Sequence, residues 1–168
     1  MPYFAILVID VSGSTRFFHD MGDISAHRIV QDIVLESAKK IEECGGRVVK
    51  HLGDGFFALL PNVLAALSAC RLAQETTANC EHGLGLRIGI HAGDVLEERA
   101  DAFGDAVNVA FRVAERSSAG QITAISDLTN SLPHEMQAAV RLLGAVILHG
   151  KPGTHKLYDL APALDLLS

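Results

Sequence analysis

The sequence predicts an α+β fold: a ferredoxin-like β-α-β-β-α-β core with additional C-terminal strands and helices. Short runs of β-forming residues alternate with longer segments of helical period, which favours a mixed architecture. Two of the short runs are separated only by Gly53-Asp54-Gly55, which is typical of a β-hairpin turn. The chain has 168 residues, of which 49% are hydrophobic, and no linker divides it. A single domain over residues 1–168 is therefore expected.

The first half of the chain supplies most of this core. Residues 3–9 form a continuous apolar run, typical of a strand buried on both faces. Residues 25–44 carry apolar side chains at helical spacing, which predicts a long amphipathic helix. Residues 47–52 and 56–60 form the two arms of the hairpin. Pro61 then begins a second helix, because proline suits the first helical turn.

The second half continues the alternation. Strands are expected over residues 84–92, 121–125, 142–148 and 156–160. The charged segment 97–101 is predicted to be a loop. A helix follows Phe103-Gly104-Asp105 and runs to about Ser117, and residues 127–140 hold turns and short helical pieces.

Composition narrows the classes of function. The formal net charge of −6 argues against non-specific binding to nucleic acid or to a membrane surface, so neither partner is expected. No apolar run approaches the ~18 residues that span a bilayer, and no basic segment precedes an apolar stretch at the N-terminus. The three cysteines lack CxxC spacing, which indicates free thiols in a reducing cytoplasm.

Two carboxylates form the first candidate site. Asp10 ends the apolar run 3–9, and Asp54 lies in the hairpin turn. In the predicted core the end of the first strand meets this turn, so the two carboxylates come together and need a cation between them. Hard oxygen ligands without nearby His or Cys favour Mg²⁺ or Mn²⁺. The small residues Val11-Ser12-Gly13-Ser14-Thr15 predict a loop whose N–H groups face an anion; an ordinary strand-to-helix turn is the alternative.

Further polar residues extend this candidate site. Lys50 lies one strand back from the turn, and Asp101 lies in the charged segment. Asn108 and Arg112 are four residues apart, so they share one face of the predicted helix.

These residues lie within five stretches whose order and spacing resemble the class III nucleotidyl cyclase catalytic domain. The stretches are Ile9-Asp10-Val11-Ser12-Gly13-Ser14-Thr15, Val49-Lys50-His51-Leu52-Gly53-Asp54-Gly55, Arg87-Ile88-Gly89-Ile90-His91-Ala92-Gly93, residues 101–112 (DAFGDAVNVAFR) and Ala119-Gly120-Gln121-Ile122. The resemblance covers Phe4 to Tyr158.

The resemblance implies a role for each matching residue. Asp10 and Asp54, assisted by the Val11 carbonyl, correspond to ligands of two Mg²⁺ or Mn²⁺ ions per site. Lys50 and Asp101 correspond to the residues that read the base. The implied roles on the helix are orientation of the ribose by Asn108 and stabilisation of the transition state by Arg112.

The chemistry of Lys50 and Asp101 favours adenine. An ammonium only donates, which suits N1 of adenine, and a carboxylate only accepts, which suits the N6 amino group. Guanine presents the reverse edge, and a site built on hydrogen bonds rejects it by up to about 10⁴–10⁵. Cytosine offers a similar pattern, so hydrogen bonding alone does not exclude CTP.

The implied activity is conversion of ATP to 3′,5′-cyclic AMP in a homodimer whose two sites are each shared between protomers. One departure from the family pattern is His149, where a lysine that contacts the distal phosphates is usual; Lys151 is the nearby substitute. The alternatives are a cyclase for another nucleotide (GTP or a pyrimidine triphosphate), a non-catalytic nucleotide-binding module and a diguanylate cyclase, whose Gly-Gly-acidic-acidic-Phe hairpin is absent. Regulation stays open, with a separate regulatory partner as one route.

Overall fold

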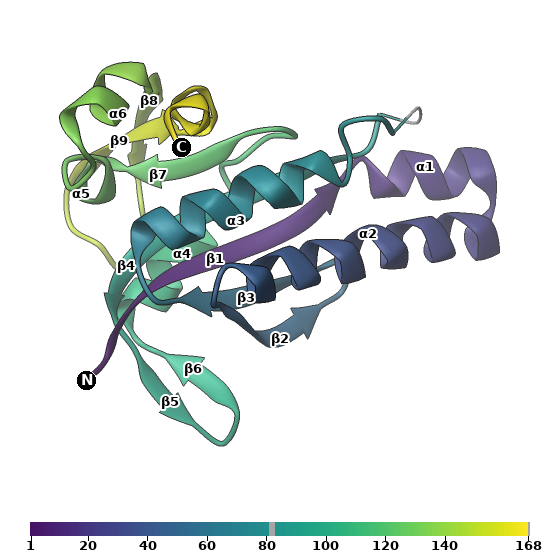
Figure 1. Ribbon diagram of the computed structural model, residues 1–168, viewed down its shortest axis with the longest axis horizontal. Coiled ribbons are helices and arrows are strands. Elements are labelled where there is room, and N and C mark those ends of the chain that lie inside the picture. Colours follow the sequence, from purple (N-terminus) through teal and green to yellow (C-terminus); the bar gives the residue numbers. More distant parts are fainter. Residues whose placement is uncertain (81–82, 168) are drawn as a thin grey trace.

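The computed structural model describes residues 1–80 and 83–167. Its strands are β1 (Tyr3–Ser12), β2 (Arg47–Leu52), β3 (Gly55–Leu60), β4 (Gly85–Asp94), β5 (Leu96–Glu98), β6 (Asp101–Phe103), β7 (Ile122–Ile125), β8 (Arg141–Ile147) and β9 (Thr154–Asp159). Its helices are α1 (Ser14–Met21), α2 (Asp23–Glu43), α3 (Val63–Glu75), α4 (Asp105–Ala114), α5 (Ser126–Thr129), α6 (His134–Ala139) and the 3₁₀ helix η1 (Ala161–Leu166). Within the described residues, one sheet has the order β2-β3-β1-β4-β7-β9-β8, and β5 pairs with β6 separately (Figure 1).

Strand β1 is the centre of the ferredoxin-like part of the sheet. It pairs antiparallel with β3 on one side and with β4 on the other. The order β2-β3-β1-β4 is that of the predicted core, and β7, β9 and β8 extend it beyond β4. The fold class predicted from the sequence is therefore confirmed.

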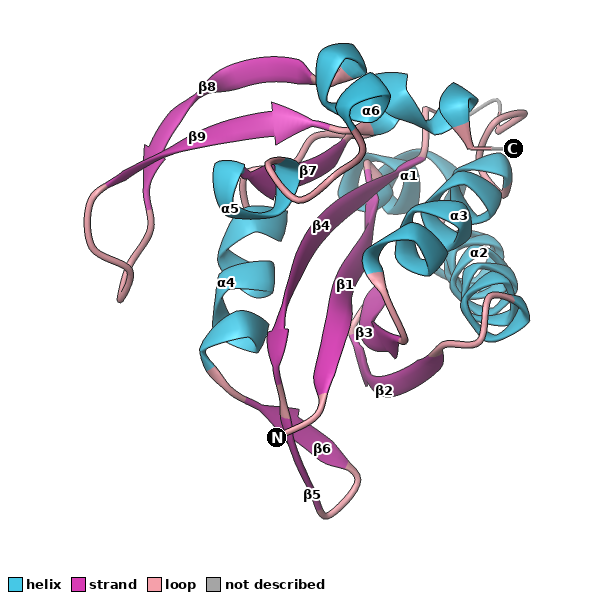
Figure 2. Cartoon of the chain, turned by 60° about the vertical axis from the view of Figure 1, so that its left-hand side comes forward, coloured by secondary structure: helices cyan, strands magenta, loops and turns pink. Residues whose placement is uncertain are grey.

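Helices cover both faces of the sheet, as Figure 2 shows. Alternate residues of a strand point to opposite faces. Ala5, Leu7 and Ile9 of β1 belong to the large core cluster beneath α2 and α3. Ile6 and Val8 belong to a second cluster with residues of α4. Asp10 follows the same alternation, so it lies on the α4 face.

The predicted loop at residues 11–15 is a single residue. Strand β1 continues to Ser12, and α1 begins at Ser14. Gly13 joins them with a φ of 87°, a left-handed conformation that glycine adopts without steric cost. Ser14 and Thr15 therefore lie in the first turn of α1, where backbone N–H groups lack helical partners. The segment thus forms a strand-to-helix turn, and its contact with an anion stays a prediction.

The segment 97–101, predicted as a loop, is instead most of a short hairpin. Strands β5 and β6 pair through Leu96 with Phe103 and Glu98 with Asp101. Arg99 and Ala100 form its turn with φ values of 52° and 61°. Two-residue hairpin turns normally contain Asn or Gly, and neither residue occurs in this turn. The sequence therefore gave no turn signal.

The remaining boundaries shift by a few residues. Helix α3 begins at Val63 rather than at Pro61, because the Asn62 side chain caps it by accepting a hydrogen bond from the Ala65 N–H at 2.8 Å. Helix α4 ends at Ala114 instead of about Ser117. Among the described residues, no helix combines the length and the apolar character needed to cross a bilayer.

Candidate active site

The backbone brings Asp10 and Asp54 together at one end of the sheet. Asp10 lies opposite Gly55 in the β1–β3 register. The Val11 N–H donates a hydrogen bond of 3.1 Å to the Asp54 carbonyl, which ties the hairpin turn to β1. The backbones of the two acidic residues are therefore adjacent, whereas the meeting of their carboxylates around a cation stays a prediction.

Asp10 also has a cationic partner that the sequence reasoning missed. Arg87 lies directly opposite Asp10 in the β1–β4 register, and its Nη2 donates to Asp10 Oδ2. The Arg87 Nε is buried and has no hydrogen-bond partner in the part of the chain that the structure describes. The available signal was an arginine in the otherwise mostly apolar strand 84–92, at a position that alternation places on the face of Gly89 and His91.

A recess of about 190 Å³ opens beside Asp10 and Arg87. Phe111, Ala114 and Glu115 from the end of α4 line its other side. Asp10 lines this recess and Asp54 does not, and no group of three or more His, Cys, Asp or Glu within residues 1–80 and 83–167 is arranged to hold a metal ion. Two carboxylates suit Mg²⁺, which commonly takes one or two carboxylates and completes its shell with water and substrate phosphates.

Lys50 reaches the α4 face because β2 contains a β-bulge. The register shifts between Val48 and Lys50, so that Val48 lies opposite Ala58 and Lys50 opposite Phe57. Ala58 belongs to the core beneath α2 and α3, whereas Phe57 belongs to the core beneath α4. Without the bulge, residues two apart would share one face. The bulge therefore turns Lys50 toward the hairpin β5–β6.

Asp101 lies at the start of β6 and meets Lys50 there. The Lys50 Nζ donates to Asp101 Oδ2 at 3.0 Å, and the Ala102 N–H donates to Oδ1 at 2.8 Å. These two hydrogen bonds, that from Lys50 first, lower the pKa of Asp101 below its ordinary value. The structure thus joins the two residues predicted to read the base and keeps Asp101 ionised.

Asn108 and Arg112 project from the exposed side of α4. Both are exposed, while Val107, Val109 and Ala110 are buried beneath them. The Arg112 guanidinium lies 3.3 Å from Glu115, one turn further along the helix. Among the described residues, no hydrogen bond or ion pair links either side chain to Asp10, Asp54, Lys50 or Asp101.

Glycines in β4 fix how closely α4 approaches the sheet. A Cβ on Gly89 would stand 2.4 Å from the Ala114 nitrogen, and one on Gly93 would stand 2.6 Å from the Ala106 Cβ. The edge-to-face contact of Phe57 with Phe111, with centroids 5.2 Å apart, adds a second anchor. The position of Asn108 and Arg112 therefore depends on backbone-to-backbone packing at Gly89.

Lys151 pairs with an acidic residue that the sequence did not assign to the site. Its Nζ is 3.1 Å from Asp127, and this hydrogen bond lowers the pKa of the Asp127 carboxyl. His91 lies nearby and is only 8% exposed; its burial, followed by the charge of Lys151, lowers the pKa of its imidazole. Neither His149 nor Lys151 has a hydrogen bond or ion pair with the carboxylates of β1 and the hairpin turn, within the part of the chain that the structure describes.

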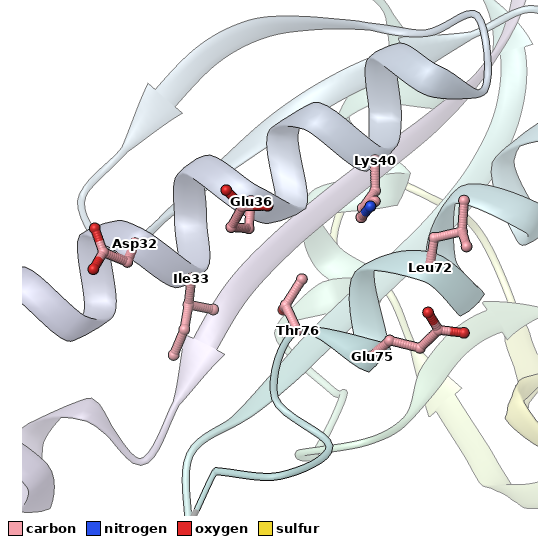
Figure 3. A pocket seen from close by; sticks show the side chains of 7 residues that line it. All are labelled: Asp32, Ile33, Glu36, Lys40, Leu72, Glu75 and Thr76. Carbon is pink, nitrogen blue, oxygen red and sulfur yellow. The ribbon is translucent and has the colours of Figure 1, made fainter.

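A separate hollow of about 340 Å³ lies between α2 and α3 (Figure 3). It is lined by Asp32, Ile33, Glu36, Lys40, Leu72, Glu75 and Thr76. None of the residues predicted for the active site lines it, and α2 and α3 cover the opposite face of the sheet from α4.

Comparison with known proteins agrees with this geometry. The family model for the adenylate and guanylate cyclase catalytic domain matches residues 2–161. A putative adenylate cyclase 3 of Rhizobium meliloti is 32% identical in an alignment of 139 positions that covers 77% of this chain and 23% of that protein. An adenylate cyclase of Streptomyces coelicolor is 33% identical over 109 residues, which are 65% of this chain and 29% of that protein. The chain thus spans less than a third of either relative.

Solved structures give the same result. An adenylate/guanylate cyclase/hydrolase from Silicibacter pomeroyi superposes with a TM-score of 0.78 at 27% identity, covering 94% of this chain and 95% of that one. A monomeric adenylate cyclase structure from Trypanosoma brucei has a TM-score of 0.79 at 22% identity, covering 96% and 91%, and supports the fold. The resemblance inferred from the five sequence stretches is confirmed, and this chain belongs to the family of adenylate and guanylate cyclase catalytic domains.

Proposed function

We propose that this chain converts ATP to 3′,5′-cyclic AMP and pyrophosphate, in a homodimer with two sites shared between protomers. The observation that carries the choice of ATP is the Lys50–Asp101 pair. Its donor and acceptor lie 3.0 Å apart, and Asp101 is held in its charged form. In this reaction the ribose 3′ oxygen forms a bond to the α-phosphorus, the bond to pyrophosphate breaks, and the hydroxyl proton is released.

Adenine binding replaces the one hydrogen bond between Lys50 and Asp101 with two hydrogen bonds to the base. The Lys50 ammonium turns from Asp101 to N1 of the base, and Asp101 accepts from the N6 amino group. The Ala102 N–H keeps Asp101 in position while the base binds. Guanine would place its N1–H donor against the ammonium, which only donates, and its O6 acceptor against the carboxylate, which only accepts, so neither Lys50 nor Asp101 would have a partner on the base.

The two carboxylates beside the β2–β3 turn are the proposed cation site. Asp10 and Asp54 would hold Mg²⁺ or Mn²⁺, two ions per site as the family resemblance implies, with the Val11 carbonyl as a further ligand. When bound, such ions hold the triphosphate and stabilise the negative charge of an in-line displacement. The first-turn N–H groups of α1, at Ser14 and Thr15 beside Gly13, lie next along the chain and suit a phosphate.

Asn108 and Arg112 are proposed to act on the ribose and the transition state. The Asn108 amide can donate to or accept from the sugar, and it has no competing partner among the described residues. Arg112 must leave Glu115 to face the α-phosphate. Both side chains of that ion pair are substantially exposed, at 44% and 62%, and exposed pairs are weak, worth about 0–1 kcal/mol.

Sharing of the site explains why its residues form separate groups within one chain. No hydrogen bond or ion pair among the described residues joins Lys50, Asp101 or Asn108 to Asp10 and Asp54. A twofold axis brings one group from each protomer to the other group of its partner, and does so twice. Lys151 stays a prediction for the distal phosphates and would have to leave Asp127.

The first experiment is an assay of the purified chain with ATP, GTP, CTP and UTP, each with Mg²⁺ and with Mn²⁺, with products identified by mass. Cyclic AMP from ATP alone is the expected result. Lys50→Met should abolish the preference for ATP, whereas Lys39→Met, which removes another exposed lysine paired to a carboxylate at 2.9 Å, should not. A different cyclic nucleotide would overturn the reading of the base, and nucleotide binding without turnover would contradict the proposed activity.

A further inference from the structure

We propose that Arg87 is a resident counter-ion of Asp10, which a divalent cation has to displace before it binds at Asp10 and Asp54. The inference rests on the cation site of the proposed function. It adds to that site a competitor built into the chain, which lowers the affinity for the cation and sets the concentration at which the site fills.

The fold itself imposes the Arg87–Asp10 contact. The two residues lie directly opposite each other in the β1–β4 register. Side chains at such positions have Cβ atoms about 4.5–5.5 Å apart on the same face of a sheet. Because β1 is paired on both sides, neither strand can slip to separate them. Arg87 is therefore always within reach of the carboxylate.

The ion pair between Arg87 and Asp10 is nevertheless weak, so a divalent cation can replace Arg87 at the carboxylate. Among the described residues, Nη2 is the one Arg87 donor with a hydrogen bond to Asp10, and Nε is buried without a partner. The two side chains are 39% and 36% exposed. Ion pairs with this much solvent contact contribute little, because water screens them. A divalent cation carries twice the charge of the guanidinium and approaches a carboxylate oxygen more closely, at about 2.0–2.1 Å for Mg²⁺.

Asp54 differs from Asp10 in this respect. Its backbone carbonyl accepts from the Val11 N–H, but no hydrogen bond or ion pair engages its carboxylate within residues 1–80 and 83–167. Glu115, which lines the same recess, is already paired with Arg112. A cation thus meets an available carboxylate at Asp54 and competes with Arg87 only for Asp10.

The test is a Mg²⁺ titration of the nitrogen-15-labelled chain without nucleotide, followed by NMR at the backbone amides of Asp54 and Gly55. Arg87→Gln removes the competing charge and should tighten Mg²⁺ binding by up to about fivefold, which is the most that a solvent-exposed ion pair of this kind contributes. Arg87→Lys keeps a charge and should bind Mg²⁺ nearly as the wild type does. Arg47→Gln is the matched control, because Arg47 pairs with Glu97 at similar exposure, 48% and 38%.

The Arg87 Nε–H signal is the second readout. In the wild type it should shift together with the Gly55 amide as Mg²⁺ is added, because the guanidinium leaves Asp10. Equal or weaker binding by Arg87→Gln, tightening by Arg87→Lys as well, or a Gly55 shift without an Arg87 shift would each overturn the proposal. The titration needs no turnover, so absence of cyclic AMP would refute the proposed function while leaving this competition to be judged on its own data.

Discussion

The variant Gly89→Ala should show whether cyclase activity depends on the position of α4 or only on the stability of the fold. The new Cβ would stand 2.4 Å from the Ala114 nitrogen, whereas ordinary contacts begin at 3.4 Å. The helix must therefore retreat by about 1 Å. Overpacking of this kind costs roughly 2 kcal/mol, which lowers the Tm of a chain this size by about 4–8 °C. A 1 Å displacement of catalytic groups can cost about 10²-fold in turnover.

Gly46→Ala is the matched control for this variant. Its Cβ would meet Leu60 at 2.7 Å and Ile41 at 2.8 Å, on the side of the sheet that faces α2. We expect a similar loss of Tm but a cyclase rate within a few-fold of the wild type. The rate is measured at a temperature well below the Tm of both variants. Equal losses of activity in the two variants would refute this reasoning. Activity would then depend on general stability and not on where α4 holds Asn108 and Arg112.

Three further predictions concern the dimer, the base and pH. Asp10→Ala and Lys50→Glu should each be inactive alone and recover about a quarter of wild-type activity on equal mixing, because half of random dimers are mixed and each keeps one intact site; mixed dimers without activity would exclude a shared site. Lys50→Glu combined with Asp101→Cys should lower the ATP-to-GTP ratio of kcat/KM by at least roughly 10²-fold, and an unchanged ratio would remove both residues from the reading of the base. His91, whose pKa is lowered by burial, binds a proton more readily in the unfolded chain, so its contribution to stability is present above about pH 6.5 and is lost as pH falls. His91→Gln should flatten the dependence of Tm on pH between neutral and mildly acidic solution, and an unaltered slope would contradict this.

The sequence predicted those parts of the fold and site that local pattern determines. The hairpin around Asp54 followed from Gly53 and Gly55, and the topology then placed Asp10 beside it. The pairing of Asp10 with Arg87 was out of reach, because it depends on which residue of β4 lies opposite, and a register cannot be read from one strand.

The position of Lys50 shows a second limit. Simple alternation assigns it to the face of Val48, and only the bulge in β2 moves it to the α4 face, where Asp101 lies. Neither the bulge nor the β5–β6 turn at Arg99 and Ala100 has a residue type that marks it. Both depend on tertiary contacts that hold the backbone in place.

The central place of β1 has a consequence for how the chain folds. Asp10 is made before its neighbours in the sheet, which come from β3, about 45 residues later, and from β4, about 77 residues later. Such long sequence separations slow folding, because the chain loses the entropy of closing a long loop before the contacts between strands stabilise it. On the ribosome β1 therefore has no partner strands until β3 and β4 have emerged. The carboxylate end of the sheet is assembled late, and a chain arrested before β4 would expose the apolar edge of β1 to aggregation.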